Sequence, residues 1–207
     1  SICAAAKARG METLAWIVGF HRSGLGQRFP EFTVRSAFGD AYRHALCPSH
    51  EETKRYVYGI VQDLVEGYEQ LDGIVMESFD FMGMLHGDHH ELIGTGRKLD
   101  LEKYMALCFC SACVRNAERL GIDTVRLRRE VRRSADRLAN FGEAEDPPGI
   151  PQYNDYLRAR AATVEEVFAG VREIVDRSPR KPKMYSTLWL AYGSDPLLYG
   201  NDPERLG

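Results

Sequence analysis

The chain has 207 residues, of which 44% are hydrophobic and 28% are charged, and its formal net charge is −3 at pH 7. This composition is ordinary for a globular protein, and a chain of this length can bury a sizeable core. The small acidic excess argues against a nucleic-acid or anionic-membrane surface, and no apolar run is long enough to cross a bilayer. Since no signal peptide is visible either, we expect a cytoplasmic protein that binds neither nucleic acid nor membrane.

The first half of the chain is expected to alternate helices and strands. Residues 1–10 look like the second half of a helix that ends on a glycine, which suggests that the chain begins inside a domain. The apolar run 13–20 predicts a strand, and a long polar loop is expected over 21–50. A helix is then expected with Ser49 as its N-cap, followed by a strand over 71–78.

The second half is expected to contain more helix. The segment 100–121 should be helical in its second half and stop at Gly121, and another helix should run from about residue 123 to Gly142. A long helix over 153–178 ends before a proline, and a third strand is expected over 183–193.

This order of elements favours a parallel α/β sheet with helical crossovers. The strands are continuous apolar runs, so we expect them to be buried on both faces. Long, chemically rich loops follow the strands, which is typical of a (β/α)₈ TIM-type barrel. We therefore predict a single barrel-type domain over residues 1–207 that forms only part of a barrel, because a full one needs about 250 residues. A doubly wound sheet is the alternative, but no Gly-rich phosphate motif follows any strand.

The cysteines predict a metal site. "LCFCSAC" (107–113) has the spacing Cys-x-Cys-x-x-Cys, and Cys47 lies upstream. Four thiolates can close a tetrahedral zinc site, so we expect a structural Zn²⁺ bound by Cys47, Cys108, Cys110 and Cys113. The alternatives are buried reduced thiols and an iron–sulfur cluster. Disulfides are disfavoured because neighbours this close rarely reach the required geometry.

The cysteine pattern resembles the structural zinc site of family 42 glycoside hydrolases, which are β-galactosidases. The segment 46–78, in which a Cys-Pro turn leads through a helix to the strand "DGIVME", is similar to a segment of uncharacterised glycosidase-like TIM barrels. The resemblance implies a barrel that acts on a carbohydrate. One departure is Met76 before Glu77, where that clan of retaining glycosidases usually has Asn before its acid/base Glu.

Glu77 is the candidate catalytic residue. It ends the second expected strand, where a barrel delivers side chains to its active face. A carboxylate there can act as nucleophile or as general acid/base, and glycoside hydrolysis needs two such groups. Asp80 is too close in sequence to be a confident partner. The structural alternative for Glu77 is a salt bridge in the mouth of the barrel.

Several residues are candidates for binding substrate. His86, His89 and His90 crowd the loop after Glu77, where they could hold sugar hydroxyls or ligate a metal. His21 and Trp189 are expected at the same rim, and the aromatic ring suits a sugar. Trp16 is expected in the core, or otherwise as a stacking surface.

Three functions remain open from the sequence. The first is a glycoside hydrolase that works through strand-end carboxylates. The second is a metal-dependent hydrolase or isomerase that uses the His-rich loop. The third is a zinc-stabilised, sugar-binding module without turnover.

Overall fold

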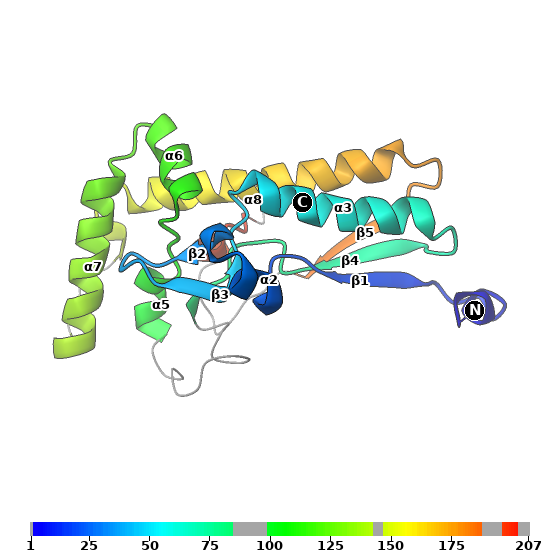
Figure 1. The fold of residues 1–207 in the computed structure, drawn as a ribbon, viewed down its shortest axis with the longest axis horizontal. Helices are drawn as coiled ribbons and strands as arrows, with labels where there is room; N and C mark the ends of the chain where they lie inside the picture. The colour runs from blue at the N-terminus through cyan, green and yellow to red at the C-terminus, as the bar shows by residue number, and fades with distance from the viewer. Residues whose placement is uncertain (1, 85–98, 143–146, 188–195, 203–207) are drawn as a thin grey trace.

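A small parallel sheet lies at the centre of the structure. The computed structural model describes residues 2–84, 99–142, 147–187 and 196–202. Three strands, β1 (Leu14–Val18), β4 (Gly73–Glu77) and β5 (Lys183–Thr187), pair in parallel in the order β1-β4-β5 (Figure 1). The predicted mixed α/β class with a parallel sheet is therefore confirmed.

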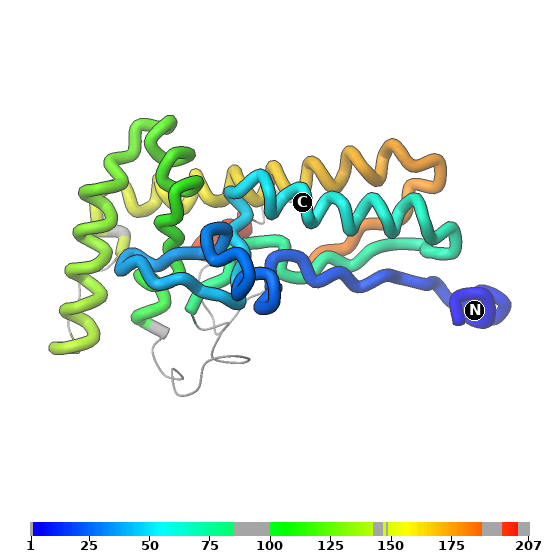
Figure 2. Tube along the Cα trace, viewed as in Figure 1, coloured from blue at the N-terminus to red at the C-terminus, as the bar shows by residue number. Residues whose placement is uncertain are grey.

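Most of the α-helices fall into two groups. In chain order the α-helices are α1 (Ile2–Lys7), α2 (Ser23–Arg28), α3 (Glu51–Gly67), α5 (Leu99–Met105), α6 (Ser111–Arg119), α7 (Thr124–Phe141) and α8 (Tyr153–Arg177). Short 3₁₀ helices are η1 (Pro30–Phe32), η2 (Pro147–Gly149) and η4 (Pro196–Tyr199). Helices α3 and α8 run together along one side of the sheet, whereas α5, α6 and α7 gather at one end and α1 lies at the other (Figures 1 and 2). None of the described helices is long and apolar enough to span a membrane.

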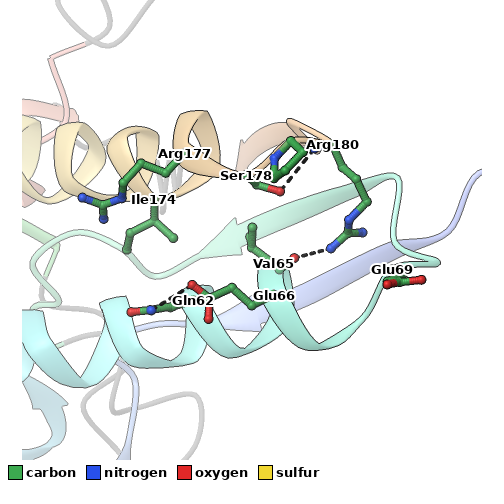
Figure 3. A pocket seen from close by; sticks show the side chains of 9 residues that line it. Gln62, Val65, Glu66, Glu69, Ile174, Arg177, Ser178 and Arg180 are labelled. Carbon is green, nitrogen blue, oxygen red and sulfur yellow. Dashed lines mark hydrogen bonds between the residues drawn. The ribbon is translucent and has the colours of Figure 1, made fainter.

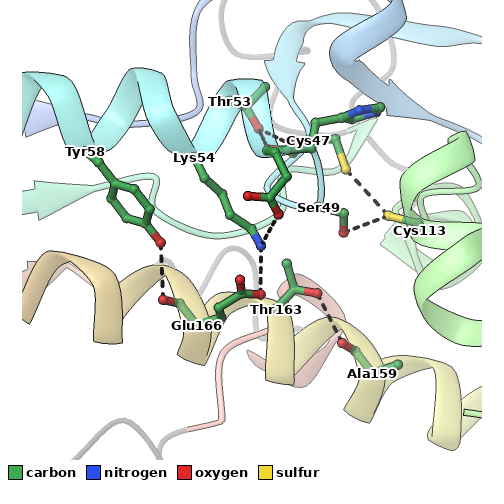
Figure 4. Close-up of polar contacts among 11 residues, drawn as sticks. Cys47, Ser49, Thr53, Lys54, Tyr58, Cys113, Ala159, Thr163 and Glu166 are labelled. Carbon is green, nitrogen blue, oxygen red and sulfur yellow. Dashed lines mark hydrogen bonds and ion pairs between the residues drawn. The ribbon is translucent and has the colours of Figure 1, made fainter. Parts of the chain in front are cut away.

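Helices α3 and α8 pack through valine-rich stripes at helical spacing. The buried valines of this interface region are Val57, Val61 and Val65 on α3 and Val164, Val167 and Val171 on α8. Lys54 adds a polar link, because its ammonium group contacts Glu51 of α3 at 3.1 Å and Glu166 of α8 at 2.7 Å (Figure 4). The Tyr58 hydroxyl also donates to the Glu166 carbonyl oxygen at 3.2 Å. These contacts fix the two helices as one layer.

The two faces of the sheet differ in burial. Ile17, Ile74 and Met76 are buried on one face. On the opposite face Trp16 is 62% exposed and Tyr185 is 41% exposed, and both lie in register with Val75. The expectation that all strands are buried on both faces is wrong for β1 and β5, and the expectation of a core Trp16 is wrong. The apolar run of β1, LAWIV, carries no polar alternation, so it could not distinguish a covered face from an open one.

The expected loop over 21–50 contains regular structure. Helix α2 packs on β3 (Ala41–Leu46), which pairs antiparallel with β2 (Thr33–Arg35). A register shift between Thr33 and Val34 interrupts this hairpin. The strands are short and irregular, which explains why periodicity in the sequence did not indicate them.

Helix boundaries follow the sequence signals at some ends only. Asp123 caps α7 by accepting a hydrogen bond from the Arg126 backbone N–H at 2.9 Å, and Gly142 ends the helix with a left-handed φ of 71°. Helix α3, by contrast, has His50 at its N-cap, so the expected Ser49 cap is wrong. The helix expected to end near Gly121 is α6, whereas α5, on the other side of the cysteine-bearing turn, was not expected.

Candidate metal centre and strand-end carboxylate

Four cysteines from three parts of the chain meet in the interior. Cys47 directly follows β3, Cys108 and Cys110 lie in the turn between α5 and α6, and Cys113 lies in the first turn of α6. Their four sulfur atoms all lie within 4.8 Å of one another, and all four residues are buried. The structure therefore brings together the set of thiols that the sequence predicted.

The sulfur–sulfur distances fit a tetrahedral ion. The Cys47 sulfur lies 3.5 Å from that of Cys113, 3.5 Å from that of Cys110 and 3.7 Å from that of Cys108. Ligand sulfurs about 2.3 Å from a tetrahedral zinc ion are about 3.8 Å apart, whereas disulfide-bonded sulfurs are about 2.0 Å apart. The cysteines are free thiols at distances suited to a shared cation.

Hydrogen-bond donors surround the sulfurs. The Arg35 backbone N–H donates to the Cys108 sulfur at 3.4 Å, and the Cys113 backbone N–H donates to the Cys110 sulfur at 3.5 Å. The Ser49 hydroxyl oxygen lies 3.2 Å from the Cys113 sulfur (Figure 4). Backbone donors of this kind orient and stabilise metal-bound thiolates. The Ser49 hydroxyl oxygen accepts a hydrogen bond from the Cys113 thiol, so its side chain contacts the cluster rather than the helix end.

Burial sets the electrostatics of the cluster. Loss of water raises the pKa of the Cys47 and Cys113 thiols above the ordinary value. Hydrogen bonds from neighbouring thiols, that of Cys108 first, lower the pKa of Cys110. A bound divalent cation would supply the positive charge that four buried thiolates need, and the donor set fits that role.

A second group of functional interest lies at the end of β4. Glu77 is the last residue of this strand, in register with Val18 of β1 and Thr187 of β5. Its side chain is half-buried, and its Oε2 atom accepts a hydrogen bond from the indole N–H of Trp16. Glu77 is thus held at the C-terminal end of the sheet, as the sequence predicted for a strand-end carboxylate.

The backbone turns sharply after Glu77. Ser78 has a left-handed φ of 55°, which non-glycine residues seldom adopt and which occurs preferentially at functional sites. Its carbonyl oxygen accepts a hydrogen bond from the Phe20 N–H at 2.8 Å, so the chain segments after β1 and β4 stay side by side. This arrangement places His21 at the same end of the sheet as Glu77.

His21 is half-buried and lies against the β2–β3 hairpin. It forms a β-bridge with Ala45, and its ring meets the His44 ring edge-on at 6.2 Å between centroids. His44 is buried, and its Nε2 atom lies 3.2 Å from the Gly83 carbonyl oxygen. The other expected substrate-binding residues, His86, His89, His90 and Trp189, lie outside the described residues.

Asp80 is a buried carboxyl group whose environment the sequence did not reveal. It accepts a hydrogen bond from the Asn201 side-chain amide at 2.6 Å, and burial raises its pKa to about 7. Arg160 partly opposes this rise; its guanidinium group lies 4.3 Å over the Phe81 ring. The only signal in the sequence was the apolar setting "SFDFM", which places an acid between two aromatic residues.

A pocket of about 550 Å³ lies between the C-terminal ends of α3 and α8 (Figure 3). Arg180 closes one side by donating hydrogen bonds to the carbonyl oxygens of Val65 and Tyr68. The pocket lies near the start of β4 and β5, at the opposite end of the sheet from Glu77. In parallel α/β folds this end supports stability rather than chemistry, so the pocket is a poor candidate for an active site.

Comparison with known proteins places the fold. No family model matches the sequence, and no curated protein matches it. The fold is similar to parts of solved glycosidases. A beta-galactosidase from the psychrophilic Marinomonas ef1 matches 89% of this chain with a TM-score of 0.55 and 12% sequence identity. A beta-galactosidase from Bacillus circulans sp. alkalophilus matches 89% of this chain with a TM-score of 0.52 and 15% sequence identity. An alpha-L-fucosidase isoenzyme 2 from Paenibacillus thiaminolyticus matches 89% of this chain with a TM-score of 0.47 and 16% sequence identity.

The matched region is a minor part of each of these proteins. The chain spans 28% of each beta-galactosidase and 21% of the fucosidase. At such low identity the likeness shows the fold alone. It supports a glycosidase-like fold for the matched 89% of the chain.

Proposed function

We propose that this chain is part of a glycosidase-like barrel that hydrolyses a carbohydrate, with Glu77 as a catalytic carboxylate. The observation that carries the proposal is the position of Glu77 at the C-terminal end of a parallel strand. Parallel α/β folds place their chemistry at this end, and the fold is similar to that of two beta-galactosidases. The left-handed Ser78 that follows supports a functional role for this turn.

The proposed chemistry requires two carboxyl groups. Glu77 would act as nucleophile or as general acid/base, and a second carboxyl group would flank the scissile bond from another strand. Asp80 does not suit the second role, because it is buried and accepts a hydrogen bond from Asn201. We therefore expect the partner carboxylate outside the described residues.

Substitution of Glu77 tests this proposal. In the intact protein, Glu77→Gln should lower the hydrolysis of a responsive p-nitrophenyl glycoside by about 1,000-fold or more, because the amide can neither attack nor transfer the proton. The panel would include p-nitrophenyl β-D-galactoside and p-nitrophenyl α-L-fucoside. Glu69→Gln, an exposed carboxylate near the other end of the sheet, is the matched control. Full turnover in Glu77→Gln would make Glu77 structural.

We further propose that Cys47, Cys108, Cys110 and Cys113 bind a structural Zn²⁺. The sulfur distances, the burial and the N–H donors to sulfur support this role. All four positions of a tetrahedral ion would be filled by protein, which is typical of a structural rather than a catalytic zinc site. The ion would tie β3 to the turn between α5 and α6.

Metal analysis of the purified protein tests the zinc proposal. We expect about one zinc per chain, lost in the triple variant Cys108→Ser, Cys110→Ser, Cys113→Ser. Cys3→Ser is the matched control, since Cys3 lies outside the cluster, and it should keep the metal. A protein purified without metal, whose melting does not respond to added zinc, would support buried thiols. Iron with visible absorption would support an iron–sulfur cluster.

A further inference from the structure

Trp16 is an unusual residue for the middle of a strand in the three-stranded parallel sheet. It lies in the middle of β1, yet 62% of its surface is exposed on the open face of the sheet. A tryptophan that only filled the core would be buried. The part of the chain that the structure describes therefore leaves the ring open, and what matters for its role is the contact that it makes.

The register of the sheet explains how Trp16 reaches Glu77. Trp16 is the direct neighbour of Val75, and Glu77 lies two residues further along β4 on the same face. Diagonal neighbours of this kind are within reach of long aromatic side chains. The indole N–H of Trp16 donates to the Oε2 atom of Glu77.

This hydrogen bond defines which oxygen of Glu77 is engaged. An indole nitrogen can only donate, so Oε2 must act as the acceptor. Within the part of the chain that the structure describes, no hydrogen bond to Oε1 is found. The contact thus holds one oxygen of the carboxyl group and leaves the other for a second partner.

We infer that Trp16 is a positioning residue that fixes the orientation of the Glu77 carboxylate and leaves Oε1 to face the reacting sugar. The inference rests on the proposed function of Glu77 as a catalytic carboxylate. Catalysis depends on such preorganisation, because a carboxylate that rotates freely spends less time in the reactive geometry. Trp16 acts through Glu77 and is not itself a catalytic residue.

The first test needs no enzyme activity. The sequence has two tryptophans, so a ¹H–¹⁵N spectrum of the protein should show two indole signals, and Trp16→Phe identifies that of Trp16. Glu77→Gln should shift the Trp16 signal, because an amide oxygen is a weaker acceptor than a carboxylate. Glu69→Gln should leave it in place. An unmoved Trp16 signal in Glu77→Gln would overturn the inference.

The second test uses the p-nitrophenyl glycoside that the protein cleaves. Trp16→Phe keeps a flat ring but loses the N–H, and it should lower kcat by about 10- to 100-fold while KM changes by less than about 3-fold. Trp16→Gln lacks the ring but restores an N–H donor, and it should recover part of kcat. Wild-type kcat in Trp16→Phe, together with a raised KM in Trp16→Gln, would make Trp16 a stacking surface and overturn the inference.

The two tests separate this inference from the proposed function. If Glu77→Gln abolishes turnover but the Trp16 signal does not move, Glu77 is catalytic and Trp16 does not position it. If the signal moves but no glycoside is cleaved, the hydrolase proposal fails while Trp16 still orients the carboxylate. Circular dichroism and metal content of each variant control for folding.

Discussion

At the scale of single residues, Asp80 is a carboxyl group whose ionisation should depend on pH near neutrality. Burial raises its pKa from 3.8 to about 7, so the folded protein binds this proton more tightly than the unfolded chain. A raised carboxyl pKa means that the ionised form is disfavoured in the folded state. Stability from this group is therefore greatest below about pH 4 and is lost as the pH rises towards 7.

We predict that Asp80→Asn flattens this dependence. Between pH 5 and pH 8 the free energy of unfolding of the wild type should fall by about 2 kcal/mol more than that of the variant. At pH 8 the Asp80→Asn variant should be more stable than the wild type, because the asparagine side chain stays neutral. Its amide oxygen can still accept the hydrogen bond from Asn201. Urea denaturation at both pH values measures the effect. Parallel profiles of the two proteins would show that Asp80 does not titrate in this range.

At the scale of elements, α2 and β3 form a close contact that depends on one glycine. A methyl group on Gly26 would lie 2.1 Å from the backbone carbonyl oxygen of Arg43 in β3. A backbone atom cannot move aside as a side chain can, so α2 would have to separate from the strand. The contact supports the strand that leads directly into Cys47.

Gly24 provides a matched control in the same helix, because a methyl group there would meet nothing within 4 Å. We predict that Gly26→Ala lowers the free energy of unfolding by about 2 kcal/mol or more. Gly24→Ala should change it little or raise it by about 0.5 kcal/mol, because alanine favours helix. Chemical denaturation of both variants measures the difference. Equal effects would show that α2 does not pack closely on β3 in solution.

At the scale of the whole molecule, the cysteine cluster joins segments that are distant in sequence. Cys47 and Cys113 are 66 residues apart, and the Tyr156 hydroxyl of α8 donates to the Cys108 carbonyl oxygen at 2.5 Å. A shared ion would therefore connect the hairpin, the turn between α5 and α6, and the layer of α3 and α8. None of the four cysteines lies in the parallel sheet of β1, β4 and β5.

We predict that removal of the proposed zinc ion destabilises the end of the molecule that holds the cysteine cluster before the rest. After treatment with a strong chelator, the melting temperature should fall by about 10 °C, because a structural ion contributes several kcal/mol. Amide hydrogen exchange should increase in residues 106–119, while β4 keeps its protection. Re-addition of zinc should restore both. Uniform loss of protection would show that the ion supports the entire fold rather than this end.

Strong local signals explain which elements the sequence predicted. Helix α7 has both an Asp123 cap and a Gly142 stop, and β4 is a compact apolar run that is also buried in the structure. The four cysteines were found because their spacing is a chemical signature that needs no knowledge of the fold. Glu77 could be selected because an acidic residue at the end of an apolar run can be recognised from the local sequence alone.

The features that were missed depend on partners distant in sequence. The exposure of Trp16 depends on what covers the sheet, and its link to Glu77 depends on the register of β1 against β4. The raised pKa of Asp80 results from burial by the fold, and the two residues that partly oppose the rise, Asn201 and Arg160, follow Asp80 by 121 and 80 positions. Short-range periodicity contains none of this information.

The separation of Cys47 from its three companions has a consequence for synthesis. At about 5 to 20 residues per second, a ribosome needs roughly 3 to 13 seconds to extend the chain from Cys47 to Cys113. During that interval the Cys47 thiol has emerged without the sulfurs that complete its site. The proposed ion can therefore acquire its full set of four sulfur ligands only after the α5–α6 turn has been made.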